Sequence, residues 1–318
     1  MHDNFLFEKK EILKGLESKR AHLSPKYFYD QQGSILFESI TKLKEYYPTR
    51  TEEKILADYS KDIYNTVGEC KTIIEPGAGN CSKALKLCRI LKPKNFIGVD
   101  ISAEFLQAGV TNLKSALPFI EARAISGDIT KRITIPPEVP DENRLFFYPG
   151  SSIGNFDPNN AKKLLTKMKS HLKINGSLLI GVDLIKSKAV LEEAYNDESG
   201  ITAQFNLNIL TNVNNVIRSD FNISDWRHYA FFNTQKSRIE MHLVSKKETK
   251  VSWPGGSRIF KIGETIHTEN SYKYSPEVFV KMLQNAGFKS QTMWSDQNSW
   301  YLIVLAQVGD KITMPRAI

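Results

Sequence analysis

The chain of 318 residues has few cysteines and no hydrophobic run long enough to cross a bilayer. Cys70, Cys81 and Cys88 cannot all pair within one chain and form no CxxC motif, which is typical of a reduced protein. The longest apolar run, near residues 300–306, is far shorter than the ~20 residues of a membrane helix. The N-terminus also lacks a basic segment before an apolar one. We therefore expect a cytoplasmic protein without disulfides, membrane anchor or secretory signal.

Metal-binding and nucleic-acid-binding patterns are also missing. The six histidines show neither HxxxH nor HxH spacing, so their pattern predicts no metal site. A net charge of +8 invites a nucleic-acid interpretation. The lysines are nevertheless scattered among acids, without a run of five like charges or interleaved aromatic residues. We predict a solvated, lysine-rich surface and no nucleic-acid partner.

The strongest positive signal is the stretch KTIIEPGAGNCSK at residues 71–83. A β-branched run, Thr72 to Ile74, meets Glu75 and then Gly77-x-Gly79, which predicts a buried strand turning sharply into a helix. Glycine has no Cβ, so this turn lets a ligand lie against the backbone. The dinucleotide fingerprint GxGxxG is incomplete because residue 82 is serine, and Walker A is absent. A tight turn without a ligand remains an open alternative for the loop alone.

Acidic residues follow the next predicted strands. Phe96 to Asp100 is an apolar strand that ends in a carboxylate, and a strand near 121–125 leads into Asp128. In open parallel sheets the carboxyl ends of the strands form the ligand crevice, where an acid binds ribose hydroxyls. Glu75 and Asp100 suit the cations and ribose of S-adenosylmethionine (SAM) better than a pyrophosphate. The arrangement resembles a class I methyltransferase.

The order of predicted elements indicates an α/β fold with a Rossmann-like doubly wound sheet. Strands at 144–148 and 177–182 extend the sheet, and a final hairpin at 290–307 gives it an antiparallel end. Residues 188–274 interrupt this alternation with helices and strand-like pieces. We expect a SAM-binding domain (62–187 plus 275–318) and a smaller α+β substrate-binding domain (1–61 plus 188–274), with substrate between them.

The sequence resembles the histidine-specific Nα-methyltransferases of ergothioneine biosynthesis over nearly its whole length. The resemblance rests on the collinear blocks KYFYD (26–30), EYYPTR (45–50), the glycine loop with Lys83, GSSIGN (150–155), AYNDESGITAQFN (194–206), IEMHL (239–243) and HTENSYKY (267–274). It implies trimethylation of the α-amino group of L-histidine to hercynine, with SAM as methyl donor.

The resemblance also implies roles for individual residues. The cofactor would be held by Tyr29, Gly77, Lys83, Asp100 and Asp128. Pro76 and Ile129 depart from the residues usual in relatives but remove no polar contact.

For the substrate, the resemblance implies contacts to both ends of histidine. Asn155 and Tyr195 would hold the α-amino and carboxylate groups, Glu269 and Ser271 would meet the imidazole, and Tyr46 would complete the pocket. Asn155 would orient the amine, and Tyr29 would assist its deprotonation by solvent.

Residue chemistry supports the imidazole contacts independently. Side chains alternate along a strand, so Glu269 and Ser271 share one face of an extended segment. A carboxylate accepts a hydrogen bond from one imidazole nitrogen, while a hydroxyl donates to the other nitrogen or accepts from it. A surface salt bridge for Glu269 and a turn position for Asn155 are the plainer interpretations.

Other functions stay open at this point. They are an N-methyltransferase for a tryptophan derivative, a nucleic-acid methyltransferase and a non-catalytic SAM sensor. A nucleic-acid methyltransferase would carry an N/D-P-P-Y/F block after the fourth strand, where this chain has Pro149-Gly150-Ser151-Ser152. We expect a monomer that takes L-histidine as its small-molecule substrate.

Overall fold

The computed structural model describes residues 2–173 and 175–309, so residues 310–318 of the second SAM-domain segment lie outside the described residues. The chain divides into two compact units by its contacts. Unit 1 comprises residues 1–47 and 186–272, and unit 2 comprises residues 48–185 and 273–318. In the described part of the chain, no helix combines the length and the apolar character that a membrane span requires.

Unit 2 is built on a seven-stranded sheet with the order β11-β12-β5-β4-β1-β2-β3. Neighbouring strands from β5 to β3 are parallel, whereas β12 runs antiparallel to both β5 and β11. This order is the class I methyltransferase sheet that the sequence predicts, including its antiparallel end. The strands are β1 (Thr72–Pro76), β2 (Asn95–Asp100), β3 (Glu121–Ser126), β4 (Arg144–Tyr148), β5 (Ser177–Asp183), β11 (Ser290–Ser295) and β12 (Tyr301–Gln307).

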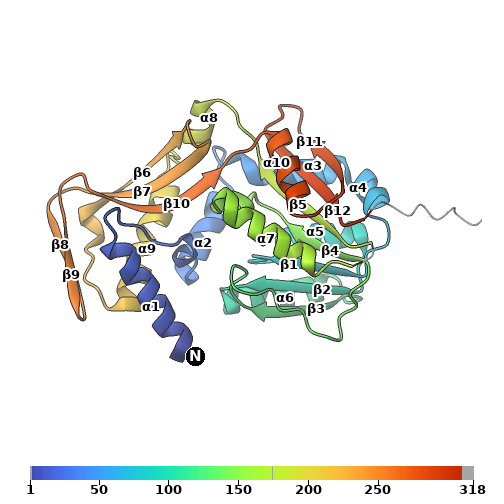
Figure 1. Ribbon diagram of the computed structural model, residues 1–318, viewed down its shortest axis with the longest axis horizontal. Helices are drawn as coiled ribbons and strands as arrows, with labels where there is room; N and C mark the ends of the chain where they lie inside the picture. The colour runs from blue at the N-terminus through green and yellow to red at the C-terminus, as the bar shows by residue number, and fades with distance from the viewer. Residues whose placement is uncertain (1, 174, 310–318) are drawn as a thin grey trace, which may run out of the picture. The chain divides into compact units, whose positions relative to one another are not determined.

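Helices cover both faces of this sheet (Figure 1). Contacts link α4 to α5 and α5 to α6, which packs on β2 and β3, while α7 contacts β5 and α10. The central strands β1, β4 and β5 are buried at every position, as parallel strands covered on both faces must be. The helices are α3 (Tyr47–Asp58), α4 (Ser60–Val67), α5 (Ser82–Leu91), α6 (Ala103–Ala116), α7 (Pro158–Ser170) and α10 (Pro276–Asn285).

The N-terminal boundary of unit 2 lies at residue 48, whereas the sequence places it at residue 62. Helix α3 begins at Tyr47, with Pro48 in its first turn, where proline is tolerated. The carboxylate of Glu52 on α3 bonds to groups of unit 2 that are described below. This contact places α3 with the large sheet.

Unit 1 holds a three-stranded antiparallel sheet, β10-β7-β6, and a separate two-stranded sheet of β8 and β9. Helix α9 packs on β6 and β7, and α1 and α2 pack on α9. These strands lie in the region where the sequence predicts helices and strand-like pieces. The elements are α1 (His2–Glu17), η1 (Pro25–Phe28), α2 (Gln31–Ile40), α8 (Lys188–Glu193), α9 (Ile201–Ile217), β6 (Trp226–Asn233), β7 (Arg238–Ser245), β8 (Thr249–Trp253), β9 (Gly256–Phe260) and β10 (Thr265–Tyr272).

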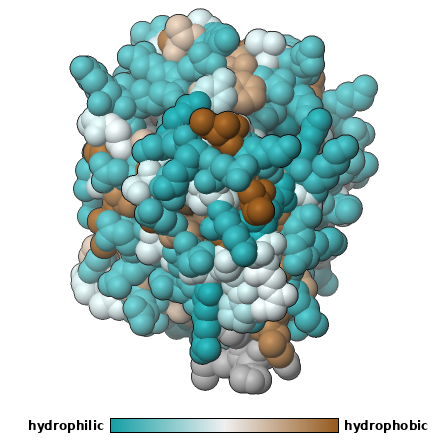
Figure 2. Space-filling view, turned by 90° about the vertical axis from the view of Figure 1, so that its left-hand side faces the viewer, coloured by the Kyte–Doolittle hydropathy of each residue, from teal (hydrophilic) through white to brown (hydrophobic). Residues whose placement is uncertain are grey.

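The molecular face in Figure 2 is mostly hydrophilic, with small and separate hydrophobic spots. Scattered surface hydrophobic residues are normal for a folded protein. This face therefore offers no broad apolar surface for a partner.

The loop that carries Asn155 leads directly into a capped helix. Asp157 is the N-cap of α7, and its Oδ1 accepts hydrogen bonds from the backbone nitrogens of Asn159 and Asn160, both at 3.0 Å. We expect Asp157→Ala to lower the free energy of unfolding by about 1 kcal/mol, because these helix-end donors lose their acceptor. Urea denaturation measures the change. The control Asp141→Ala, which removes only a surface carboxylate, is expected to change it by less than about 0.5 kcal/mol.

Candidate functional site

The glycine loop joins β1 to α5 and is tied to the end of β2. Gly77 and Gly79 have φ angles of 72° and 51°, the left-handed region that glycine adopts without strain. The backbone nitrogen of Gly77 donates to Val99 O at 2.7 Å. Helix α5 begins at Ser82, directly after the loop, as the predicted turn into a helix requires. The loop therefore exposes backbone at the carboxyl edge of the sheet, in the geometry that a nucleoside ligand requires.

Asp100 ends β2 beside this loop. Its Oδ2 accepts from Gly79 N and its Oδ1 from Ser102 N, both at 2.9 Å. Burial raises the pKa of Asp100, while these backbone hydrogen bonds lower it. An ionised carboxylate has about four acceptor sites. Asp100 is thus held in a fixed orientation and keeps capacity for ribose hydroxyls.

Glu75 lies on β1, immediately before the loop, and is 2% exposed. Its Oε2 is buried without a hydrogen-bond partner in the described part of the chain. Burial raises the pKa of Glu75 well above its usual range, and the nearby Lys83 opposes that shift. A buried polar atom that lacks a partner has a free-energy cost that a ligand can remove. A nearby cation, such as the sulfonium of SAM, favours the ionised carboxylate and opposes the effect of burial, so this residue fits that cofactor.

Glu52 is the centre of a network that sequence reasoning missed. This residue on α3 is 1% exposed, and its Oε2 lies 2.6 Å from Lys83 Nζ. Its carboxylate also accepts from Gly150 N and, at 2.7 Å, from Tyr301 Oη. A Cβ at Gly181 would come within 2.0 Å of Glu52 Oε1, so only glycine leaves room for this network. No local sequence pattern indicates this network, because the partners of Glu52 are far apart in the chain.

Lys83 and Gly150 place this network at the topological switch point of the sheet. β1 and β4 are neighbours in the sheet. After β1 the chain continues to β2 on one side, and after β4 it continues to β5 on the other side. Ligands of open α/β sheets bind at such a point. Glu52 therefore pairs with Lys83, one of the residues that we expect to hold the cofactor.

Asp128 and Asn155 follow β3 and β4, and both are half-buried. Asp128 Oδ1 accepts from Thr130 N at 2.9 Å and from its hydroxyl at 2.5 Å. Asn155 ends the short helix η2 (Ser152–Asn155), which Ser151 enters with a φ of 56°. Unit 2 thus places Gly77, Lys83, Asp100, Asp128 and Asn155 on segments that follow the carboxyl ends of neighbouring strands.

Unit 1 brings together most of the residues expected to meet histidine. Tyr195 Oη donates to Ser271 Oγ at 2.9 Å, and both residues are buried. The rings of Tyr46 and Tyr195 meet edge to face, with centroids 6.3 Å apart. Tyr29 also lies in unit 1, where its ring contacts those of Phe37 and Phe205. The hydroxyls of Tyr195 and Ser271 therefore form one polar group beside an aromatic wall.

Glu269 and Ser271 lie on the same face of β10, the arrangement that strand alternation predicts. They pair with Met241 and Ile239 of β7, and both are buried, with Glu269 7% exposed. A bulge between His267 and Glu269 interrupts the strand, so His267 does not share this face. Sequence alternation alone places His267 beside Glu269 and does not predict the bulge.

Comparisons with known proteins agree with these features. Residues 8–308 match the model of the family described as "Histidine-specific methyltransferase, SAM-dependent". A histidine N-alpha-methyltransferase of Mycobacterium tuberculosis is 34% identical over 304 residues, covering 94% of each chain. One of Mycolicibacterium smegmatis is 35% identical over 294 residues, covering 91% of each. The ergothioneine biosynthesis protein 1 of Neurospora crassa is 30% identical over 88% of this chain but 32% of its own length.

The family match covers most of both units, and the sheet order, the glycine loop and the acids at the strand ends agree with a SAM-binding fold. The chain therefore belongs to the family of histidine-specific, SAM-dependent methyltransferases.

Proposed function

We propose that this methyltransferase transfers three methyl groups to the α-amino nitrogen of L-histidine and produces hercynine for ergothioneine synthesis. The observation that carries the proposal is the buried group of Glu269, Ser271 and Tyr195 on unit 1. A carboxylate and a hydroxyl on one strand face match the two nitrogens of an imidazole.

The proposal gives the two units different tasks. Unit 1 recognises the imidazole through Glu269 and Ser271, with Tyr46 and Tyr195 beside it. Unit 2 holds the cofactor through Gly77, Lys83, Asp100 and Asp128, and Tyr29 adds a cofactor contact. SAM supplies a methyl group bonded to a positively charged sulfur.

The amine must present a neutral lone pair to the methyl carbon for each transfer. A nitrogen–carbon bond forms as the sulfur–carbon bond breaks, and the product amine must lose a proton to solvent before the next transfer. Asn155 has no useful pKa and cannot act as a base, but its amide orients the amine and the carboxylate. Positioning of this kind contributes several kcal/mol to lowering the barrier. Tyr29 assists the loss of the proton.

The amino acid specificity follows from Glu269. A prenylated indole offers no second ring nitrogen and leaves the buried carboxylate poorly matched, which costs about 1–3 kcal/mol. The proposal therefore favours histidine over a tryptophan derivative.

Mass spectrometry of the reaction products tests this proposal directly. Histidine incubated with enzyme and SAM is expected to gain one, two and finally three methyl groups. A matched reaction with tryptophan or dimethylallyltryptophan is expected to give no product. Methylation of a tryptophan compound alone would replace histidine as substrate, and absence of any methylated product would end the proposal.

Substitution of Asp100 tests the cofactor contacts that we propose. Asp100→Ala removes the carboxylate that orients the loop at Gly79 and that we assign to the ribose. We expect the affinity for S-adenosylhomocysteine to fall about 10-fold to 100-fold, because a charged hydrogen-bond acceptor is lost. Isothermal titration calorimetry measures this affinity. Asp58→Ala, which removes an exposed carboxylate paired with Lys54, is the control and should bind as the wild type does.

A further inference from the structure

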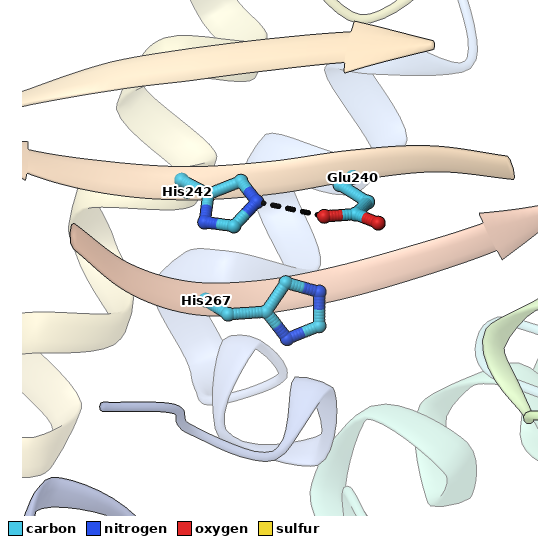
Figure 3. A group of neighbouring side chains, drawn as sticks. All are labelled: Glu240, His242 and His267. Carbon is cyan, nitrogen blue, oxygen red and sulfur yellow. Dashed lines mark hydrogen bonds and ion pairs between the residues drawn. The ribbon is translucent and has the colours of Figure 1, made fainter. Parts of the chain in front are cut away.

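A cluster of three potential metal ligands lies on the small sheet of unit 1. Glu240 and His242 belong to β7, and His267 belongs to β10 (Figure 3). One ligand atom from each residue lies within 4.8 Å of the other two. His267 pairs directly with His242, and Asn270 with Glu240, so their side chains share a face of the sheet. Glu269 and Ser271 lie on the other face.

We propose that Glu240, His242 and His267 bind a divalent transition-metal ion of the zinc type. Two imidazoles and one carboxylate are a donor set that proteins use for such ions. This inference is independent of histidine methylation, because it concerns the sheet face that does not carry Glu269.

The spacing of the group fits the proposal. His242 Nε2 lies 3.2 Å from Glu240 Oε2. Two ligand atoms that each lie ~2.0–2.2 Å from a tetrahedral ion are about 3.3–3.5 Å apart. The pair therefore stands almost at the separation of two bound ligands. The ligand atom of His267, within 4.8 Å of the other two, needs a further approach of at most about 1.5 Å.

The surrounding contacts orient the carboxylate. Glu240 Oε1 accepts from Arg238 Nε at 2.8 Å and from Asn233 Nδ2 at 2.9 Å. Oε2 faces His242 instead. Arg238 therefore occupies Oε1 and leaves Oε2 for an ion. Hydrogen bonds that fix a ligand in this way are usual around protein metal sites. Burial raises the pKa of Glu240, but its hydrogen bonds, led by that from Arg238, bring it down to about 2, so the group is ionised.

The two imidazoles are neutral, as metal ligands must be. Burial lowers the pKa of both rings, and that of His267 falls to about 4, with a further contribution from His242. His267 Nε2 lies 3.0 Å from Asn270 Oδ1, an oxygen that supports one ring nitrogen. In the part of the chain that the structure describes, His242 Nδ1 is buried without a hydrogen-bond partner and can take the ring proton. Metal binding at Nε2 would then replace the hydrogen bond between Nε2 and Glu240 Oε2.

The backbone at His267 is already fixed. Its nitrogen donates to Ala21 O, and its oxygen accepts from Leu23 N, both at 2.9 Å. An ion held by His267 and by β7 would join the two strands beside the bulge that precedes Glu269. We assign the ion a structural role, stabilising the strand whose other face carries the predicted imidazole contacts.

Cobalt(II) titration of the full chain tests the site. The protein is freed of any affinity tag, treated with EDTA and desalted, and no histidine is added. We expect one equivalent of cobalt to give the strong visible absorption of a four-coordinate ion, without a thiolate charge-transfer band. Zinc should displace the cobalt and raise the thermal midpoint.

Variants locate the ion. His242→Gln and His267→Gln are each expected to lower cobalt affinity by at least about tenfold, since even outer contacts of a metal site have effects of that size. His171→Gln, at the end of α7 in unit 2, is the matched control and should bind cobalt like the wild type. Circular dichroism without metal establishes that each variant is folded.

X-ray absorption of the wild-type zinc complex gives a second measurement that needs no variant. We expect its spectrum to show two imidazole ligands and no sulfur ligand. Equal, weak affinity in the wild type and in His267→Gln would mean an adventitious ion only and would overturn the proposal. Sulfur in the X-ray absorption spectrum would also overturn it.

Discussion

Glu269→Ala is expected to lower kcat/KM for histidine methylation about 100-fold or more, while the affinity for S-adenosylhomocysteine stays unchanged. The variant removes the buried carboxylate that we assign to an imidazole N–H. Leaving such a donor unsatisfied in a buried pocket costs about 3 kcal/mol, which corresponds to a rate factor of about 100. The cofactor should be unaffected, because we assign its contacts to other residues.

Steady-state kinetics with histidine and calorimetry with S-adenosylhomocysteine measure the two effects. Glu248→Ala removes an exposed carboxylate from the same unit and serves as the control, with kinetics like those of the wild type. Unchanged histidine kinetics in Glu269→Ala would remove the basis for histidine recognition. Equal loss of cofactor affinity would instead indicate a general structural defect.

Glu52→Ala should lower the free energy of unfolding by about 3–5 kcal/mol, the usual cost of removing one partner of a buried ion pair. The substitution deprives Lys83 Nζ, Gly150 N and Tyr301 Oη of their shared acceptor. Lys83 keeps only 19% of its side-chain surface exposed, so water replaces the lost carboxylate incompletely. The amide of Glu52→Gln retains an acceptor oxygen, so its loss should be smaller.

The neighbouring residue gives a close control for this experiment. Glu53 pairs with Lys86 at the protein surface, and Glu53→Ala should change the free energy of unfolding by less than about 1 kcal/mol. Urea denaturation of the three variants measures both effects. If Glu52→Ala and Glu53→Ala cost the same, the buried network does not stabilise unit 2 as we infer.

Local sequence signals account for much of unit 2. The β-branched run before Gly77 and the apolar run before Asp100 are strong strand signals, and the structure has β1 and β2 at these places. The positive φ angles at Gly77 and Gly79 follow from a turn that requires glycine. The start of α3 was harder to predict, because Pro48 indicates either a helix start or a break.

The arrangement of side chains in unit 1 is harder to predict from the sequence. The bulge between His267 and Glu269 changes which side chains share a face, and the residues around it do not predict it. Glu240 and His242 are an ordinary alternating pair on a strand, and His267 becomes their neighbour only through the pairing of β7 with β10. A search for closely spaced histidines therefore finds no metal site.

The strand–glycine-loop–helix segment and the acids at the strand ends could be predicted from the sequence alone, because backbone sterics and hydrophobic periodicity act over a few residues. The sequence also contains the collinear blocks on which the family resemblance rests. The bonds of Glu52 to Lys83, Gly150 and Tyr301, and the bond of Tyr195 to Ser271, depend on the folded arrangement of distant segments. These partners are brought together by strand order and helix packing, which depend on the whole folded unit, so no local pattern could reveal them.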